Sequence, residues 1–506
     1  MFFFHHQLRE VRTKAVAATL LLIALAVWMR GWGTLYEPND PFTIATSCPP
    51  FFQGCNVPLG LFNQWMFESF GQHYNRVIQA TFLIPIELGL IALYLNKTRL
   101  AMGCLLAVFI LRAGTLLFKF PVLNFDLYDI IFLFIFITAP NKLVYSKFFF
   151  VAIYFVCSTI KFDEGWIAGA YFTSLAHGLP LIPKDEAAAM VAGNGVILLQ
   201  IFFAWGLFST NLKIKSACFY LLVAFHVYST TMVGLRFPVS TLPLLLVLFL
   251  PDLKPDYRLT NLSDKSRLFD LEVGSWPLKA RAVLAICFVL LSFVQIHKVT
   301  IPGNEKLSFQ GSGFSFFMFD GNHQCAFIVE KEDSIGRIGL LESKANIYGQ
   351  HRCSTYNYLS YSKQKYCLDA NKDEFRFSMF SSINGERMFQ IIDRVKLCSV
   401  NYRHFSNNDW INLTHDPSGP GHLVYKNLYG HRMGSMNPLQ LDADGRGVRD
   451  PLLQASKEFV RIEPTALERW GREILIAQYF YWLCYLMMSF YVIYLILVSG
   501  RANQYE

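Results

Sequence analysis

Long apolar runs separated by short, mostly basic segments make up residues 1–297 of the chain. A run of about 20 apolar residues is long enough to cross the hydrocarbon core of a membrane as a helix. The first run is expected over residues 15–28 and the last over residues 474–498, and the others begin near residues 77, 102, 128, 148, 189, 217, 238 and 280. This pattern predicts a polytopic α-helical membrane protein with about nine or ten spans.

A second pattern begins at residue 298, where apolar and polar residues alternate over short segments. These segments are FSFFMF at 314–319, CAFIVE at 325–330 and FRFSMFSSI at 375–383. Turn residues bound them, and Asn-Gly at 384–385 between two alternating runs is a strong hairpin signal. We therefore expect an antiparallel, mainly β soluble domain.

The two patterns divide the chain into three parts. Residues 1–297 form the predicted multi-span domain, residues 298–472 the β-rich domain, and residues 473–506 the last span with a short tail. Within the second part we expect loops over about residues 406–450 and a helix-like stretch over residues 452–469.

Composition and charge support a membrane protein with a defined orientation. Only 16% of the residues are charged, against about 25% in soluble proteins. Much of the net charge of +8 lies in short loops, as the positive-inside rule expects, so it does not indicate nucleic-acid binding. Basic residues mark the N-terminal arm and the predicted cytoplasmic turns: Arg9, Arg12, Lys14, Lys97, Arg99, Lys142, Lys147, Lys213 and Lys215.

Both termini are then cytoplasmic, and the β-rich domain lies on the opposite side of the membrane. That side is the periplasm if the membrane is a bacterial inner membrane, or the lumen if it belongs to the endoplasmic reticulum. The lipid bilayer is the first predicted partner.

The cysteines test this topology independently. Five fall within predicted spans: Cys104, Cys157, Cys218, Cys287 and Cys484. The other six fall in the two long segments assigned outside: Cys48, Cys55, Cys325, Cys353, Cys367 and Cys398. Disulfides persist in oxidising compartments, so these six are disulfide candidates, with free thiols as the alternative. No metal site is predicted, because the chain has no C-x-x-C pair.

Lys161 is the main candidate for chemistry. It stands at the exit of an apolar run and is followed by Asp163, Glu164 and Trp166. A lysine in a low-dielectric pocket is pushed toward its neutral form, and a neutral amine is a usable base. The alternative is a lysine whose stem lies along the helix while its ammonium reaches the headgroups.

Other polar residues interrupt the predicted spans. Arg112 can form a structural ion pair with Asp126 or Asp129, which follow Asn124 at the start of the fourth span. His226 is suited either to catalysis or to a hydrogen bond between helices. The prolines in residues 234–243 predict a short, kinked or re-entrant eighth span.

At four places the chain resembles the vitamin K-dependent γ-glutamyl carboxylase family and its bacterial relatives. The matching places are residues 154–169 around Lys161, His226 with Gly234, Phe237 and Pro238, residues 313–318, and residues 381–393. Their order and the predicted topology also agree with that family over roughly residues 10–400. Lys161 stands at the position of the family's catalytic lysine.

The resemblance implies a reaction and its participants. The family uses the lysine to activate vitamin K hydroquinone, which reacts with O2 while CO2 is added to a peptide glutamate and the quinol becomes an epoxide. It also implies a secreted or membrane peptide substrate. The residues expected around the quinol and substrate are Trp166, Asn124, Asp126, His226, Arg112 and Phe237.

One departure opens an alternative. The family has histidine after the asparagine at the start of the fourth span, whereas this chain has Phe125 after Asn124. A phenyl ring cannot replace imidazole in proton transfer. The alternatives are therefore a relative that performs epoxidation without carboxylation, or a membrane scaffold without catalysis.

Overall fold

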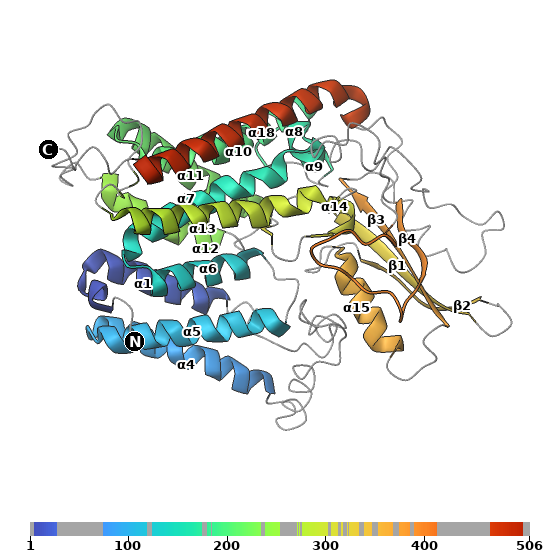
Figure 1. The fold of residues 1–506 in the computed structure, drawn as a ribbon, viewed down its shortest axis with the longest axis horizontal. Helices are drawn as coiled ribbons and strands as arrows, with labels where there is room; N and C mark the ends of the chain where they lie inside the picture. Colours follow the sequence, from blue (N-terminus) through green and yellow to red (C-terminus); the bar gives the residue numbers. More distant parts are fainter. Residues whose placement is uncertain are drawn as a thin grey trace.

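The computed structural model shows a bundle of helices with a small β-sheet beyond one end (Figure 1). It describes residues 5–27, 74–118, 124–174, most of 180–253, most of 271–411 and 466–498. The bundle consists of α1 (Val11–Val27), α4 (Tyr74–Tyr94), α5 (Thr98–Phe118), α6 (Asn124–Thr138), α7 (Lys142–Cys157), α10 (Glu186–Leu198), α11 (Leu212–Val233), α12 (Pro238–Phe249), α13 (Leu278–His297) and α18 (Ala466–Val498). Each predicted apolar run therefore contains a helix.

Four helical segments among the described residues are long and apolar enough to cross a membrane. They cover residues 142–161, 186–208, 278–300 and 472–498, and shorter apolar helices cover residues 80–94, 127–138 and 238–253. The chain is thus a mostly helical protein with the features of a membrane protein. The eighth predicted span is short, as expected, because α12 has only 12 residues and contains Pro243.

Helix α7 is the centre of the bundle. All its residues except Leu143 are buried, and it contacts α1, α6, α12 and α13. A helix that is apolar on every side is stable only where other elements surround it. The phenylalanine-rich sequence of α7 therefore explains its central position.

Several predicted cytoplasmic turns meet at the end of the bundle away from the sheet. Arg12 Nη2 lies 2.7 Å from Asp252 Oδ1, and Lys147 Nζ lies 2.9 Å from Asp252 Oδ2. Lys142 Nζ donates to the carbonyl oxygens of Phe136 and Ile137, at 2.5 and 3.1 Å. These contacts join segments far apart in the sequence, and Lys142 and Lys147 are buried rather than solvated.

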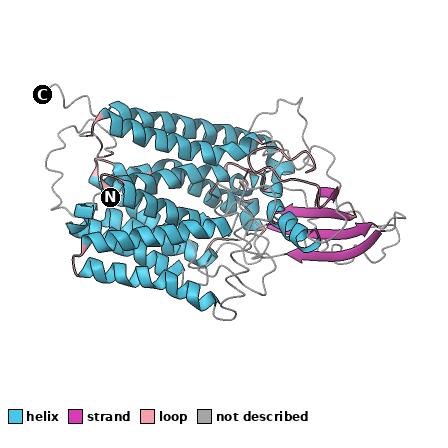
Figure 2. Ribbon diagram, turned by 60° about the horizontal axis from the view of Figure 1, so that its bottom comes forward, coloured by secondary structure: helices cyan, strands magenta, loops and turns pink. Residues whose placement is uncertain are grey.

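The sheet is antiparallel, with strand order β2-β1-β3-β4. Its strands are β1 (His323–Glu332), β2 (Ile338–Asn346), β3 (Phe375–Ile383) and β4 (Phe389–Lys396). Figure 2 shows the strands at one end of the helices in a second view. The segments at 325–330 and 375–383 are strands as predicted, and β3 and β4 form the hairpin that Asn384 begins, with φ of 54°.

The prediction of a strand at 314–319 is wrong for the residues of it that the structure describes. Ser315 and Phe316 lie outside regular structure. The side chain of Gln295 binds the Phe316 backbone instead: its Oε1 accepts from Phe316 N at 2.7 Å, and its Nε2 donates to Phe316 O at 3.1 Å. The structure also contains helix α15 (Thr355–Tyr366), which the alternating pattern did not predict.

Among the described residues, two disulfides are present, Cys325–Cys353 and Cys367–Cys398. Both lie in the β-rich region, where the sequence analysis expected disulfides. The five cysteines assigned to spans are free, also as expected. Cys48 and Cys55 lie outside the described residues.

Acid should destabilise the β-rich region through His404. The ring of this residue lies 4.6 Å from Tyr356 and 5.1 Å from Tyr402, between ring centroids. Burial lowers the pKa of His404 to about 4, whereas an unfolded chain has a histidine pKa of about 6.5. The unfolded state therefore binds the proton more readily, and stability is lost as the pH falls from about 6.5 to about 4.

We expect a loss on the order of 2 kcal/mol, since one pKa unit corresponds to about 1.4 kcal/mol and the partly exposed ring keeps some hydration. Urea unfolding of the purified protein at a series of pH values measures it. His404→Gln should reduce the pH dependence in this window. An unchanged dependence in that variant would contradict the assignment.

Candidate functional site

Lys161 lies in a buried turn that follows α7. The helix passes into a 3₁₀ turn (Ser158–Lys161), then into α8 (Glu164–Ile167) and α9 (Ala170–Thr173). The Lys161 side chain is only 1% exposed. Its Nζ lies 5.0 Å from the centroid of a Trp166 ring and 3.4 Å from the carbonyl oxygen of Cys157. The structure thus brings together two of the predicted site residues, Lys161 and Trp166.

Asp163 connects this turn to the segment that leads into the sheet. Its Oδ1 accepts from the backbone N of Trp166 at 3.3 Å, which fixes the start of α8. Its Oδ2 forms an ion pair with Lys306 of α14 (Glu305–Ser308). Both side chains are nearly buried, at 10% and 8% exposure, so this pair is shielded from solvent.

The hairpin tip also contacts the turn. A Cβ added to Gly165 would lie 2.7 Å from Nδ2 of Asn384, the residue that follows β3. A larger side chain at position 165 would therefore push the hairpin away. Two separate parts of the β-rich region, Lys306 and Asn384, thus meet the segment that carries Lys161.

The opposite side of the turn is held by α10 and α18. Gln478 Nε2 donates to the carbonyl of Phe162 at 2.6 Å. Asn194 Nδ2 donates to the carbonyl of Ile167 at 2.8 Å, and Tyr481 Oη donates to Asn194 Oδ1 at 2.5 Å. These amides satisfy backbone carbonyls that no helix ladder reaches, which a buried turn requires.

Two glycines make this packing possible. Gly169 has φ of +73°, a conformation that side chains other than glycine rarely adopt. At Gly193 a Cβ would lie 2.1 Å from the carbonyl oxygen of Trp166. The turn and α10 therefore approach more closely than any other residue at position 193 permits.

His226 occupies a separate polar cluster deeper in the bundle. Its Nε2 is hydrogen-bonded to Tyr154 Oη of α7, and its Nδ1 lies 3.1 Å from Thr241 Oγ1 of α12. All three residues are at most 1% exposed. His226 thus joins three helices through hydrogen bonds. Tyr154 precedes Lys161 by about two helical turns, or about 10 Å.

Arg112 belongs to a third location. Its Nη2 lies 3.8 Å from Asp129 Oδ2, and this pair links α5 to α6. It is one of the ion pairs that the sequence analysis considered. The backbone of Asn124 and Asp126 begins α6, but their side chains, together with Phe237, lie outside the described residues.

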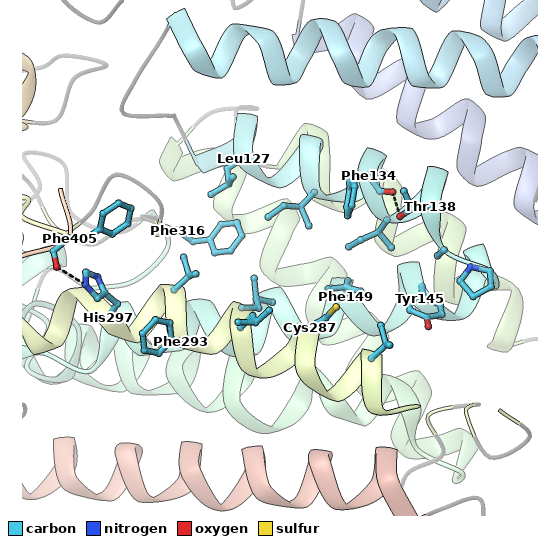
Figure 3. Close-up of a pocket in the computed structure, with 18 of the residues that line it drawn as sticks. Leu127, Phe134, Thr138, Tyr145, Phe149, Cys287, Phe293, His297, Phe316 and Phe405 are labelled. Carbon is cyan, nitrogen blue, oxygen red and sulfur yellow. Dashed lines mark hydrogen bonds between the residues drawn. The ribbon is translucent and has the colours of Figure 1, made fainter. Parts of the chain in front are cut away.

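An apolar groove runs between α6 and α13, with the start of α7 at one end (Figure 3). Its volume is about 750 Å³. Phe134, Phe149 and Cys287 line its length, while His297 and Phe405 stand where it approaches the β-rich region. Lys161 is not among the residues that line it. The groove and the lysine turn are therefore separate features.

The end of the groove near His297 nevertheless approaches the lysine turn. Phe316, held by Gln295, lines the groove. Lys298 follows His297 in the chain and is 1% exposed. Lys161 and Lys298 both lie close enough to Cys157 to act on it electrostatically. The end of the groove that His297 and Phe316 line thus lies in the same region as the lysine turn, at the junction of bundle and sheet.

Four further residues belong to these sites although the sequence did not predict them there: Lys306, Tyr154, Gln295 and Gln478. Gln295 and Gln478 carried a usable signal, because each is a polar amide inside an apolar run. Lys306 carried none, since its partner Asp163 is remote in the sequence.

Comparisons with protein-family models, curated proteins and solved structures found no match to this chain.

Breaking the buried pair Asp163–Lys306 should destabilise the junction strongly. Removing one member leaves an uncompensated buried charge, so Lys306→Ala is expected to destabilise the protein by about 3–5 kcal/mol. Asp163→Asn should recover part of that loss in the double variant, because it removes the remaining charge. Thermal or denaturant unfolding of the wild type, the two single variants and the double variant gives the coupling energy between Asp163 and Lys306.

Arg394→Ala provides the matched control. Arg394 is 43% exposed and pairs with Glu330 at 2.9 Å, so its loss should change stability by less than about 1 kcal/mol. Equal effects of Lys306→Ala and Arg394→Ala would argue against a buried ion pair at the junction.

Proposed function

We propose that the protein is a membrane enzyme that uses a lipid-soluble quinol and resembles γ-glutamyl carboxylase in its chemistry. The observation that carries this proposal is the burial of the Lys161 amine, 1% exposed, at the junction of the helical bundle and the β-rich region. A lysine shielded from water is favoured in its neutral form and can then accept a proton. The reaction class comes from the resemblance of residues 154–169, around Lys161, to the γ-glutamyl carboxylase family.

The proposal includes a polytopic topology with the β-rich domain outside the cytoplasm. Two observations support it. The basic turns near Lys142 and Asp252 gather at the end of the bundle away from the sheet. The two disulfides lie in the β-rich region, and disulfides persist in oxidising compartments. The membrane is then a bacterial inner membrane or that of the endoplasmic reticulum.

The groove between α6 and α13 suits the quinol. Its lining is almost entirely apolar, and it lies on the side of the bundle, where a membrane-dissolved molecule can enter. In this proposal Phe134 and Phe149 contact the hydrocarbon part, and the polar ring approaches the junction near His297. Vitamin K hydroquinone, when bound, would supply the reducing equivalents that let O2 form the epoxide and water while CO2 replaces a glutamate proton.

The protein residues then have distinct tasks. Lys161 does not line the groove, so in this proposal the quinol ring extends beyond the groove to the lysine turn, where Lys161 accepts its hydroxyl proton. Trp166 fixes the position of the amine. Asp163 holds the turn against the β-rich region through Lys306. A glutamate-containing peptide can add to the edge strand β2, where Leu340 and Leu341 are exposed. Burial of the turn excludes water from the reaction.

Lys161→Ala should abolish the reaction. Loss of a general base typically lowers the rate by at least about a hundredfold. The measurement is the yield of epoxide and of carboxylated peptide from purified protein supplied with naphthoquinol, O2 and labelled CO2. Lys142→Met is the control, because Lys142 is equally buried but binds carbonyls at the other end of α7. Unchanged yields in Lys161→Ala would reject the role of Lys161.

The rate at which Cys287 is chemically modified should show whether a ligand occupies the groove. Cys287 is a free, partly buried cysteine that lines the groove, whereas Cys484 is free and partly buried on α18. A naphthoquinone analogue at about ten times its Kd should slow modification of Cys287 by a membrane-permeant maleimide about tenfold. Modification of Cys484 should not change. Equal protection of both cysteines would place the analogue elsewhere.

A second candidate is a membrane scaffold without catalysis. The position of the Lys161 amine over the Trp166 ring favours it, since a cation–π contact stabilises the charged ammonium. Phe125, where the family has histidine, favours either this candidate or epoxidation without carboxylation. Formation of epoxide without carboxylated peptide would identify an enzyme that performs only epoxidation. The absence of both products would identify a scaffold without catalysis.

A further inference from the structure

Helix α4 presents two different seams of side chains. The inner seam consists of Phe82, Ile86, Gly89 and Leu93, all buried. A Cβ on Gly89 would lie 2.9 Å from the Leu21 side chain of α1 and 3.1 Å from Cβ of Cys104 of α5. This seam therefore packs α4 tightly against its two neighbours.

The outer seam repeats the same spacing on the opposite face. It consists of Ala80, Ile84, Glu87, Ile91 and Tyr94, all exposed. Their separations alternate between four and three residues, which is the repeat by which one helix packs along another. Figure 1 shows α4 at the edge of the bundle, next to α5. The outer seam is thus directed away from the bundle.

Glu87 is the exceptional member of the outer seam. It precedes Tyr94 by about two turns, so it lies about 10 Å from the end of α4. Ile84 and Ile91 on either side are 56% and 53% exposed. Among the described residues, none forms an ion pair or hydrogen bond with its carboxylate. A carboxylate facing lipid at this depth is costly, and ionisable residues within spans almost always face a partner.

We propose that the outer seam of α4 binds a membrane-spanning helix of another protein that carries a lysine or arginine opposite Glu87. The inference rests on the part of the proposed function that places α4 in a membrane. The apolar members supply a packing surface, and the carboxylate requires a cation at one depth. The apolar members therefore specify that the partner is a membrane-spanning helix. The carboxylate specifies where along that helix the lysine or arginine must lie.

A second copy of this chain fits the seam less well. Two copies of α4 would bring two Glu87 carboxylates together, and like charges at an interface are unfavourable. The exposed basic residues of the described bundle helices lie near the helix ends, as Arg99 of α5 and Lys279 of α13 do. Glu87, in contrast, lies about 10 Å from the end of α4, so a second copy offers these basic residues at a different position along the helix from Glu87.

The experiment uses the full-length protein in vesicles and synthetic spanning peptides labelled for energy transfer. One peptide is leucine-rich with a single lysine about 10 Å from its end, a second has leucine at that position, and a third has glutamate. We expect the wild type to bind the lysine peptide about tenfold more tightly than the leucine peptide. The glutamate peptide should bind no better than the leucine peptide.

Glu87→Leu should remove the preference for lysine. Ile110→Ala is the matched control on the exposed face of α5, where Ile110 is 58% exposed, and it should keep the preference. Lys161→Ala should also keep it, so that failure of the catalytic proposal and failure of this one remain separate. The relative affinities of the wild type for the three peptides test the proposal even if Glu87→Leu does not fold.

Equal affinity of the wild type for the three peptides would overturn the proposal. Energy transfer between two labelled copies of the wild type, lost in Glu87→Leu, would also overturn it and identify a second copy as the occupant.

Discussion

A lysine amine kept away from water is the constraint on which the junction between bundle and sheet depends. Lys161 lies in the turn that follows an apolar helix surrounded by other helices, so its amine cannot reach solvent. The surrounding structure must supply polar or aromatic contacts, and the Cys157 carbonyl and the Trp166 ring do so. The remaining parts of the turn then need their own partners, because its backbone is buried without a helix ladder. Asp163, Gln478 and Asn194 supply them from three directions.

This arrangement makes the position of the lysine sensitive to the β-rich region. Asp163 is two residues from Lys161 and binds both the α8 backbone and Lys306. A displacement of Lys306 would therefore release one side of the turn. Asn384, at the hairpin tip, contacts the same turn at Gly165. A ligand that shifts the sheet could thus alter the lysine environment through two direct contacts, without any change inside the bundle.

The sequence predicted local features well and long-range pairings poorly. Apolar length identified every helix of the bundle, since a membrane-sized run has few other stable conformations. Asn384 with Gly385 identified the β3–β4 hairpin, because an Asn-Gly turn fixes the chain direction locally. The segment at 314–319 failed, since the alternating pattern could not show that Gln295 would bind the Phe316 backbone. Likewise, nothing near Asp163 in the sequence indicates Lys306.

Polar residues inside the bundle explain why its helices meet in one arrangement. Arg112 on α5 faces Asp129 on α6, and His226 on α11 joins Tyr154 on α7 to Thr241 on α12. Apolar contacts alone allow a helix to rotate or slide, whereas a buried polar group excludes every register that leaves it without a partner. An apolar run thus determines that a helix forms, and the polar residue within it determines which neighbour that helix must meet. In our proposal Glu87 follows the same principle on the outer face of α4, where no described residue of this chain pairs with its carboxylate.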